Sequence, residues 1–373
     1  MSHIFNHIYV TIKITLKCNL ACQYCYGRDN HASGAQMTEE EIIRGIDFVH
    51  GYAVEVKAKS LMMCWHGGEP FLLSKKLPSF IDYANKLFSQ SGISISHGIQ
   101  TNATLLLPST FDMIKKYFNG FVGVSIDLYS GFRTFPNGKL STELAVRIRC
   151  GAINLITQHN LGHIEEIYNF YKARKMNVRL ARVFPINDSE DFTSPMYVSD
   201  KQFADAMIEY FDLWANDTTP APNSDIVGLV GDLLTGMPSL CLREDKCHQR
   251  YTALSPGGDV FSCAEFDVPE SVIGNFLTQT PKEFAMSDCR DRLAAKAPMP
   301  QECTDCKYLS VCHGGCFRER FMVGYSYRCK SNRIYWDHIV DWLKNKGVSL
   351  YILRGKSREE KQQIINEIFG KRK

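Results

Sequence analysis

Three features that mark membrane, secreted or nucleic-acid-binding proteins are missing from this sequence. No apolar run approaches the about 20 residues that a membrane-spanning helix needs. Residues 1–14 alternate between polar and apolar side chains, so they lack the continuous apolar core of a signal peptide. The net charge is only +3, which leaves no excess of basic residues for binding nucleic acid. These absences predict a cytoplasmic protein that binds neither a membrane nor nucleic acid.

Cysteine, in contrast, is abundant and unevenly placed. The chain has 14 cysteines, of which three lie between Cys18 and Cys25 and nine between Cys241 and Cys329. Disulfides are rare in the cytoplasm, so another use must account for this number. Clustering of this kind favours metal binding over scattered small core residues.

The first 215 residues alternate between short segments rich in Val and Ile and amphipathic segments with helical spacing. Thr38, followed by Glu41, forms a capping box that marks the start of one helix. Six strand–helix units in series predict a parallel sheet, either doubly wound or closed as a partial barrel. The predicted strands cover residues 8–14, 61–66, 93–100, 121–126, 152–157 and 178–184; the other predicted helices cover residues 77–88, 110–117, 142–150, 164–174 and 200–214.

Beyond residue 215 the periodicity fades. Residues 216–223 form the core of a predicted linker, which we extend to residues 216–240. Gly, Pro and Cys then dominate up to Cys329, and such a loop-rich segment needs bound metal for stability. Helical character returns around residues 335–343 and 358–369.

The most compact cysteine group directly follows the first predicted strand. Residues 15–27 read TLKCNLACQYCYG, which gives the spacing Cys-x3-Cys-x2-Cys at Cys18, Cys22 and Cys25. Three thiolates this close can hold one [4Fe–4S] cluster and leave one iron open. An open iron can bind S-adenosylmethionine and, with one electron, cleave it to a 5′-deoxyadenosyl radical. A zinc knuckle is the alternative, although zinc sites more often add a second pair of ligands.

These residues resemble the signature of the radical S-adenosylmethionine (radical SAM) superfamily, in which an aromatic residue, here Tyr24, precedes the last cysteine. The segment WHGGEP at residues 65–70 is similar to the family's GGEP motif. By this resemblance Gly67 and Gly68 let the backbone approach the methionine amino group of S-adenosylmethionine, and Glu69 accepts a hydrogen bond from it.

Two further motifs follow in the order that the family shows. IQTNATL at residues 99–105 is close to its QTN motif, which places Gln100 and Asn102 at the site. VSID at residues 124–127 resembles the motif whose Ser, here Ser125, contacts the ribose. The Arg-x4-Gly spacing is kept by Arg133 and Gly138, so Arg133 is the candidate ligand of the methionine carboxylate, although Leu128 replaces a Gly of the family.

The resemblance also implies the fold class, α/β with a partial (β/α)6 TIM-type barrel, and a site at the carboxyl ends of the strands. The later cysteines match the seven-cysteine SPASM domain, with Cys241 as an extra ligand seen in anaerobic sulfatase-maturating enzymes. The predicted domains are residues 1–215, the linker, a loop-rich SPASM domain at 241–333 and a helical segment at 334–373.

Eight of these cysteines suffice for two fully ligated [4Fe–4S] clusters, which makes three clusters in all; zinc held by four thiolates is the alternative. By the resemblance, one auxiliary cluster is held by Cys241, Cys247, Cys263 and Cys316, and the other by Cys303, Cys306, Cys312 and Cys329. Cys64, Cys150 and Cys289 fall outside both patterns and are interpreted as buried or surface thiols.

The resemblance implies a peptide or protein substrate. Sulfatase maturases carry an Asp directly after the cysteine that corresponds to Cys263, whereas this chain has Ala264 and then Glu265. We therefore favour a peptide maturase that forms an intramolecular carbon–carbon cross-link of the cyclophane type, with Glu265 as a candidate base. Formylglycine formation from Ser or Cys and thioether cross-linking are the enzymatic alternatives, and an iron–sulfur electron carrier is the non-enzymatic one.

Two kinds of protein partner follow from this interpretation. Reduction of the clusters requires an electron donor such as flavodoxin or ferredoxin. Only 17 residues precede Cys18, so we expect no fused leader-binding domain. The leader of the precursor peptide is then expected to dock on this chain or on a separate leader-binding protein.

Overall fold

The chain divides into two units and passes between them several times. The computed structural model describes residues 5–27, 33–119, 121–135, 149–183, 193–244 and 246–369. The first unit contains Met1–Asp127, Gly131–Ile153 and Lys246–Lys296, and the second contains Leu128–Ser130, Asn154–Asp245 and Ala297–Lys373.

A parallel sheet forms the centre of the first unit. Its strands pair in chain order, and every pair from β1 to β5 is parallel, as the repeated strand–helix pattern predicts. Along β1, Ile8, Val10 and Ile12 are buried and alternate with residues of the opposite face. The strands are β1 (His7–Thr15), β2 (Ser60–Gly67), β3 (Ser94–Thr101), β4 (Phe121–Ser125) and β5 (Arg149–Ile156).

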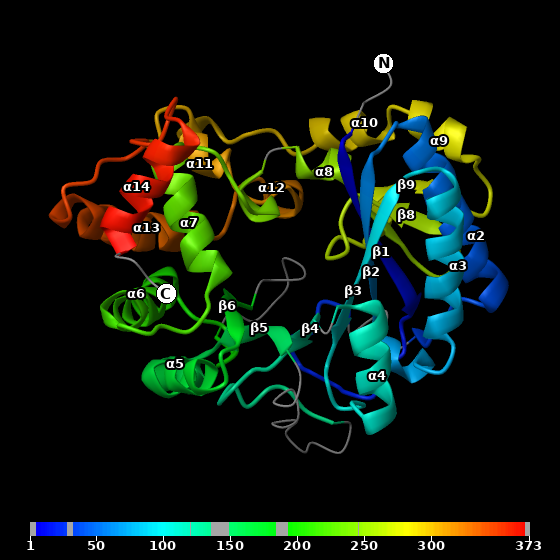
Figure 1. The fold of residues 1–373 in the computed structure, drawn as a ribbon, viewed down its shortest axis with the longest axis horizontal. Coiled ribbons are helices and arrows are strands. Elements are labelled where there is room, and N and C mark those ends of the chain that lie inside the picture. Colours follow the sequence, from blue (N-terminus) through cyan, green and yellow to red (C-terminus); the bar gives the residue numbers. More distant parts are fainter. Residues whose placement is uncertain are drawn as a thin grey trace. The chain divides into compact units, whose positions relative to one another are not determined.

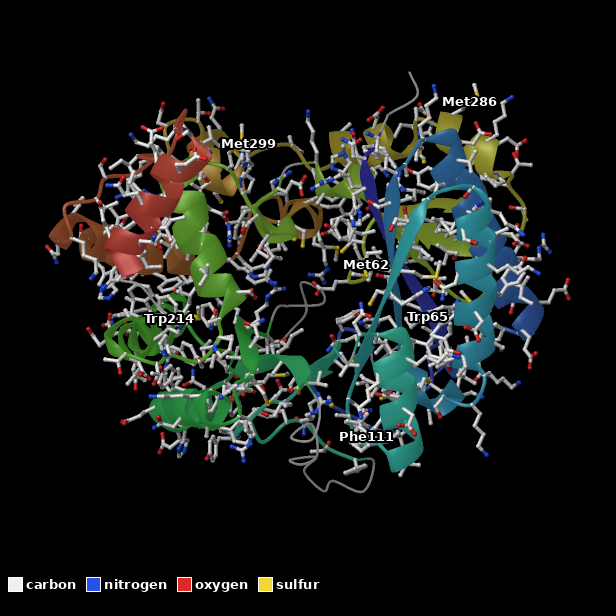
Figure 2. The ribbon with its side chains drawn as sticks, viewed as in Figure 1. Met62, Trp65, Phe111, Trp214, Met286 and Met299 are labelled. Carbon is white, nitrogen blue, oxygen red and sulfur yellow. The ribbon has the colours of Figure 1, made fainter. Side chains whose placement is uncertain are left out.

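Helices cover one face of this sheet. α2 (Glu39–Glu55) begins at Thr38, and the predicted capping box with Glu41 is present. Figure 1 shows α2 and α3 (Leu77–Gln90) side by side along β1–β3; α4 (Pro108–Tyr117) follows β3. Trp65, labelled in Figure 2, is fully buried on the helix-covered face of β2, whereas Met62 belongs to the opposite face.

Three short strands that we did not predict extend the sheet beyond β1. β7 (Tyr251–Leu254) pairs with β1 in parallel, and Tyr9 stacks on Tyr251 with ring centroids 4.7 Å apart. β8 (Asp259–Phe261) and β9 (Val272–Asn275) then continue the sheet in antiparallel fashion. Strands of three or four residues show too little alternation to be recognised in sequence. Between and after them lie α8 (Cys247–Arg250), η5 (Pro269–Ser271), α9 (Pro281–Met286) and α10 (Cys289–Ala295).

The second unit is mainly helical. β6 (Asn177–Arg182) follows the end of β5 in the strand order, and α5 (Ile164–Ala173) lies beside α6 (Asp200–Asn216) in Figure 1. On α6, Trp214 is buried (Figure 2), and the ring of Phe211 meets that of Trp342 with centroids 5.3 Å apart. The remaining elements are η3 (Gln158–His163), η4 (Cys241–Arg243), η6 (Gln301–Cys303), α11 (Leu309–Cys312), α12 (Phe317–Val323), α13 (Cys329–Asn345) and α14 (Arg358–Phe369).

Two predictions need correction. The predicted linker 216–240 contains a helix, α7 (Ser224–Thr235), capped by Asn223, and Leu229 and Leu233 pack its buried face. Cys150, predicted at the end of a helix, lies in β5, and residues 142–148 of that predicted helix lie outside the described residues. The other domain boundaries stay a prediction. In the part of the chain that the structure describes, no helix is long and apolar enough to cross a membrane.

Candidate cluster and S-adenosylmethionine site

The loop that carries the first three cysteines starts where β1 ends. Thr15 forms a bridge with Gln36, and the N–H of Leu16 donates to the carbonyl of Ala35 over 2.7 Å. The N–H of Lys17 donates to the hydroxyl of Thr15 over 3.1 Å, which turns the chain out of the strand. The three cysteines therefore follow the carboxyl end of the central strand, where a parallel sheet places its sites.

A second segment of the chain pins this loop. The N–H of Ala21 donates to the carbonyl of Thr134 over 2.7 Å, and the N–H of Gln23 donates to that of Phe132 over 3.2 Å. These bonds border the loop with residues 132–134, so Arg133 lies beside the cysteines.

Burial raises the pKa of all three thiols, that of Cys25 to about 11. The charge of Cys18 also raises the pKa of Cys22 and Cys25, whereas Arg133 lowers it at each thiol, so the three sulfurs and the guanidinium are neighbours. No three His, Cys, Asp or Glu side chains among the described residues are placed to bind a single metal ion. A four-iron cluster holds its ligands further apart than one ion does, and it would displace the thiol protons.

The two glycines of the GGEP motif allow two backbone segments to approach closely. Gly67 has φ +135°, and a Cβ there would overlap the carbonyl oxygen of Thr15. A Cβ at Gly68 would overlap that of Lys17. The N–H groups of Gly68 and Glu69 donate to these same carbonyls over 2.8 and 2.9 Å. The two glycines thus allow the end of β2 to pack against the loop that leads to Cys18. Their approach to the methionine amino group of S-adenosylmethionine stays a prediction.

Glu69 is fully buried and joins the ends of β2 and β3. Oε1 accepts hydrogen bonds from the N–H of Phe71 over 2.9 Å and from the hydroxyl of Thr101 over 2.8 Å, and Oε2 accepts one from the N–H of Asn102 over 2.7 Å. Burial raises the pKa of Glu69, and these bonds oppose the rise. Glu69 therefore has a structural role, in addition to the contact with S-adenosylmethionine that the resemblance implies.

Asn102 connects β3 to the cysteine loop. Its Nδ2 donates to Oδ1 of Asn19 over 2.8 Å and to Sγ of Cys18 over 3.7 Å. Its Oδ1 accepts hydrogen bonds from both the N–H and the hydroxyl of Thr104, and Asn19 donates to that hydroxyl over 2.7 Å. The network fixes the position of Cys18.

Arg133, Asp127 and Tyr24 form a buried polar cluster. Nη1 of Arg133 lies 3.3 Å from Oδ2 of Asp127, which also accepts a hydrogen bond from the Tyr24 hydroxyl, and Nη2 donates to the carbonyl of Asn102 over 3.4 Å. Burial lowers the pKa of Arg133, but the charges of Asp127, Tyr24 and Cys22 together outweigh burial and leave this pKa above its ordinary value. Sequence reasoning missed Asp127, although it is the last residue of the VSID motif. Gly138 lies outside the described residues.

Gln100 and Ser125 meet on the face of the sheet opposite Trp65 and the helices α2 and α3. Nε2 of Gln100 donates to the Ser125 hydroxyl over 3.2 Å, and a Cβ at Gly123 would overlap Oε1 of Gln100. The glycine in β4 thus makes room for Gln100. The predicted residues Tyr24, Gln100, Asn102, Ser125 and Arg133 all follow or end strands of the first unit.

Two carboxylates, those of Glu265 and Asp267, act on Tyr26, the residue that follows Cys25. Tyr26 is half-buried, and its pKa is raised first by loss of contact with water and then by the charges of Glu265, Asp267, Cys25 and Cys263. Glu265 is exposed, as a surface carboxylate would be. Asp267 is instead half-buried and forms an ion pair of 2.7 Å with Lys13, whose side chain is 3% exposed.

The second predicted set of auxiliary ligands lies within the second unit. Burial raises the pKa of Cys312 to about 12, and the charges of Cys329, Cys303 and Cys306 raise it further, so the four thiols are neighbours. Backbone turns hold them: the N–H of Cys306 donates to the carbonyl of Cys303 over 3.1 Å, and that of Cys329 donates to the carbonyl of Ser326 over 2.9 Å. Four thiolates suit either a cluster or zinc.

The first predicted set is divided between the two units. Cys247 opens α8 and Cys263 follows β8 in the first unit, whereas Cys241 and Cys316 belong to the second. This set stays a prediction. Among the three remaining cysteines, burial raises the pKa of Cys64 to about 12 and that of Cys150 to about 11, and Cys289 is 2.8 Å from the Ser287 hydroxyl.

Residues 12–170 match the profile of the Radical SAM superfamily. This stretch is a radical SAM domain. It contains the three cysteines and the motifs that follow them, so the resemblance seen in the sequence is confirmed.

Sequence relatives cover most of the chain. A serine-type anaerobic sulfatase-maturating enzyme of Bacteroides thetaiotaomicron is 24% identical over 342 residues, which are 79% of this chain and 80% of the relative. A cysteine-type anaerobic sulfatase-maturating enzyme of Clostridium perfringens is 22% identical over 313 residues, 75% and 82% of the two chains.

Solved structures share the fold of this chain. The structure of native anSMEcpe with bound AdoMet and Cp18Cys peptide gives a TM-score of 0.77 at 21% identity over 91% of this chain and 98% of the other. Streptococcus suis SuiB bound to precursor peptide SuiA gives 0.59 at 14% identity over 85% and 72%. These likenesses confirm an α/β fold with a parallel sheet; closure of a barrel stays a prediction.

Proposed function

We propose that this protein is a radical SAM maturase that removes hydrogen from a side chain of a ribosomally made precursor peptide and forms an intramolecular carbon–carbon cross-link. Its relatives are named as maturases of sulfatases, and two of the similar structures were solved with peptides bound. The observation that carries the radical chemistry is the group of three neighbouring thiols beside the buried Arg133 at the end of β1.

The residues at this site fit the cluster and the cofactor. Cys18, Cys22 and Cys25 offer three soft thiolate ligands and no fourth cysteine, which suits a [4Fe–4S] cluster with one open iron. When bound, the cluster and S-adenosylmethionine supply the radical that removes hydrogen from the substrate.

The protein's own residues orient these groups. Asn102 and Asn19 hold the Cys18 end of the loop, and the backbone of residues 132–134 holds its middle. The pKa of Arg133 lies above its ordinary value, so Arg133 stays protonated and presents a buried cation for the carboxylate of S-adenosylmethionine. Gln100 and Ser125 present polar atoms on the face of the sheet opposite α2 and α3, where we place the ribose.

The proposed base is Glu265. Of the two carboxylates that act on Tyr26, Asp267 is already engaged in an ion pair with Lys13. Glu265 is exposed and can therefore meet a substrate from solution. Glu265→Gln should slow product formation, with Glu270→Gln, an exposed carboxylate on η5, as a matched control. Equal rates of product formation for both variants would mean that Glu265 is a surface carboxylate without a role as base.

A second candidate is oxidation of Ser or Cys to formylglycine, which similarity to both serine-type and cysteine-type sulfatase-maturating enzymes favours. Ala264 argues against it, because the carboxylate that these enzymes carry directly after the corresponding cysteine is missing here. Thioether cross-linking is a third outcome of the same radical step.

Mass spectrometry of the product distinguishes these reactions. Small peptides encoded by open reading frames next to this gene would be tested as substrates, each incubated anaerobically with S-adenosylmethionine and a reductant. We expect a loss of two hydrogens and a gap in the fragment series between two linked residues. A complete fragment series together with capture by a hydrazide would identify formylglycine and overturn the cross-linking proposal.

We further propose three [4Fe–4S] clusters, reduced by a flavodoxin or ferredoxin, and a peptide leader that docks on this chain or on a separate leader-binding protein. Three clusters require about twelve irons per chain. Iron and zinc analysis after anaerobic reconstitution tests the number: stoichiometric zinc at the later cysteines would overturn the two auxiliary clusters.

A further inference from the structure

Arg320 on α12 is a buried cation of the second unit. It is 5% exposed, and its guanidinium donates to three carbonyl oxygens: those of Ala297 over 3.2 Å, His313 over 3.3 Å and Gly315 over 2.7 Å. Within the described residues, no carboxylate forms an ion pair with Arg320.

Two other arginines of this unit are balanced. Arg243 forms a buried ion pair with Asp232, and Arg328 lies 2.5 Å from the buried carboxylate of Glu319. Removing a charge from water costs several kcal/mol unless an opposite charge offsets it, and carbonyl dipoles supply only part of that compensation. We therefore expect an anionic group near Arg320 that compensates its charge.

The cysteines of the second auxiliary set supply such a group. The carbonyls of His313 and Gly315 lie in the loop between Cys312 and Cys316, so Arg320 is held against the ligand-bearing segment. The N–H of Gly315 donates in turn to the carbonyl of Cys312 over 2.8 Å, so the backbone that Arg320 contacts is bonded directly to a ligand residue of this set.

We propose that Arg320 balances the negative charge of the cluster held by Cys303, Cys306, Cys312 and Cys329, and thereby raises its reduction potential. A cluster with four thiolate ligands is anionic and gains a further negative charge on reduction. A fixed cation nearby stabilises the reduced form more than the oxidised form. The inference rests on the proposed auxiliary cluster, and it makes Arg320 a positioning and tuning residue rather than a ligand.

The experiment uses the full chain with Cys18, Cys22 and Cys25 replaced by Ala, so that only auxiliary clusters give signals. In this background, Arg320→Gln removes the charge but keeps N–H donors, and Arg320→Lys keeps the charge. Arg179→Gln is the control, because Arg179 is paired with Asp225 elsewhere in the same unit. Each protein is analysed for iron and zinc and then titrated with a reductant under electron paramagnetic resonance.

We expect one auxiliary signal of Arg320→Gln to shift to lower potential. At a fixed poise its reduced-to-oxidised ratio should fall about tenfold, which corresponds to about 59 mV for a one-electron couple. Arg320→Lys and Arg179→Gln should keep the original potential. If Arg320→Gln loses iron, its potential cannot be compared, and Arg320→Lys becomes the test. Iron retained in Arg320→Lys at the original potential supports the role of the charge.

Three results would overturn the inference. An unchanged potential in Arg320→Gln with full iron removes the charge effect and leaves the cluster assignment intact. Loss of iron from both Arg320 variants makes Arg320 a hydrogen-bonding residue only. Zinc in place of iron in the protein with native Arg320 overturns the auxiliary cluster itself, and only this result also contradicts the proposed cofactor content.

Discussion

Replacing Glu69 by Gln tests whether the carboxylate at the end of β2 holds the candidate site together. Glu69 is fully buried and accepts three hydrogen bonds, at 2.9, 2.8 and 2.7 Å. The Gln oxygen can still accept the bonds from Phe71 and Thr101, but its amide group then faces the N–H of Asn102 with two donors. A buried N–H without an acceptor costs about 1–3 kcal/mol.

The other two bonds also weaken, by up to about 1 kcal/mol each, because a neutral oxygen replaces a charged one. Burial raises the pKa of Glu69, so the ionised carboxylate carries a desolvation cost that Gln avoids, and this offsets part of the loss. We therefore expect Glu69→Gln to lower the free energy of unfolding of the first unit by about 2–4 kcal/mol.

The matched control is Glu41→Gln. Glu41 is also a glutamate that accepts a backbone hydrogen bond, from Thr38 over 2.7 Å, but it is only half-buried at the start of α2. Its replacement should cost less than about 1 kcal/mol, since water can replace the lost bond.

Urea denaturation measures the loss of stability, and hydrogen exchange measures it locally. In Glu69→Gln the amides of Phe71 and Asn102 should exchange faster, whereas amides of the second unit should not change. If Glu69→Gln is no less stable than Glu41→Gln and both amides keep their protection, the carboxylate does not hold β2 and β3 together, and our account of this residue is wrong.

Three further predictions use other residues. Arg133→Ala should weaken binding of S-adenosylmethionine by about 2 kcal/mol, or about 30-fold, because a buried charge-assisted contact is lost; unchanged affinity in calorimetric titration would remove Arg133 from the site. Cys22→Ala should abolish formation of 5′-deoxyadenosine, measured by chromatography, and should keep the auxiliary iron; persistent cleavage would mean that the open cluster lies elsewhere. Burial lowers the pKa of His97 to about 4, below its ordinary value of 6.5, so the folded protein holds this imidazole neutral. The contribution of neutral His97 to the free energy of unfolding is therefore complete above pH 6.5 and is lost as the pH falls towards 4, because the unfolded chain binds the proton first. This loss should be on the order of 3 kcal/mol in denaturation experiments, and His97→Asn should remove this part of the pH dependence.

Local patterns in the sequence were sufficient for the central strands and for the position of the site. Alternating apolar residues predicted β1–β6, and the capping box at Thr38 predicted the start of α2, because periodicity and caps depend on neighbouring residues only. The spacing of Cys18, Cys22 and Cys25 after β1 identified the radical SAM domain, since ligands of one cluster must follow closely in the chain.

Tertiary structure alone decided which polar groups compensate one another. Asp127 meets Tyr24, 103 positions away, and Arg320 remains without a carboxylate among the described residues although Glu319 is its neighbour in sequence. No sequence pattern predicts such pairing, because burial and distance between remote segments set it. The same reason applies to β7–β9, whose few residues become strands only because β1 offers an edge with which to pair.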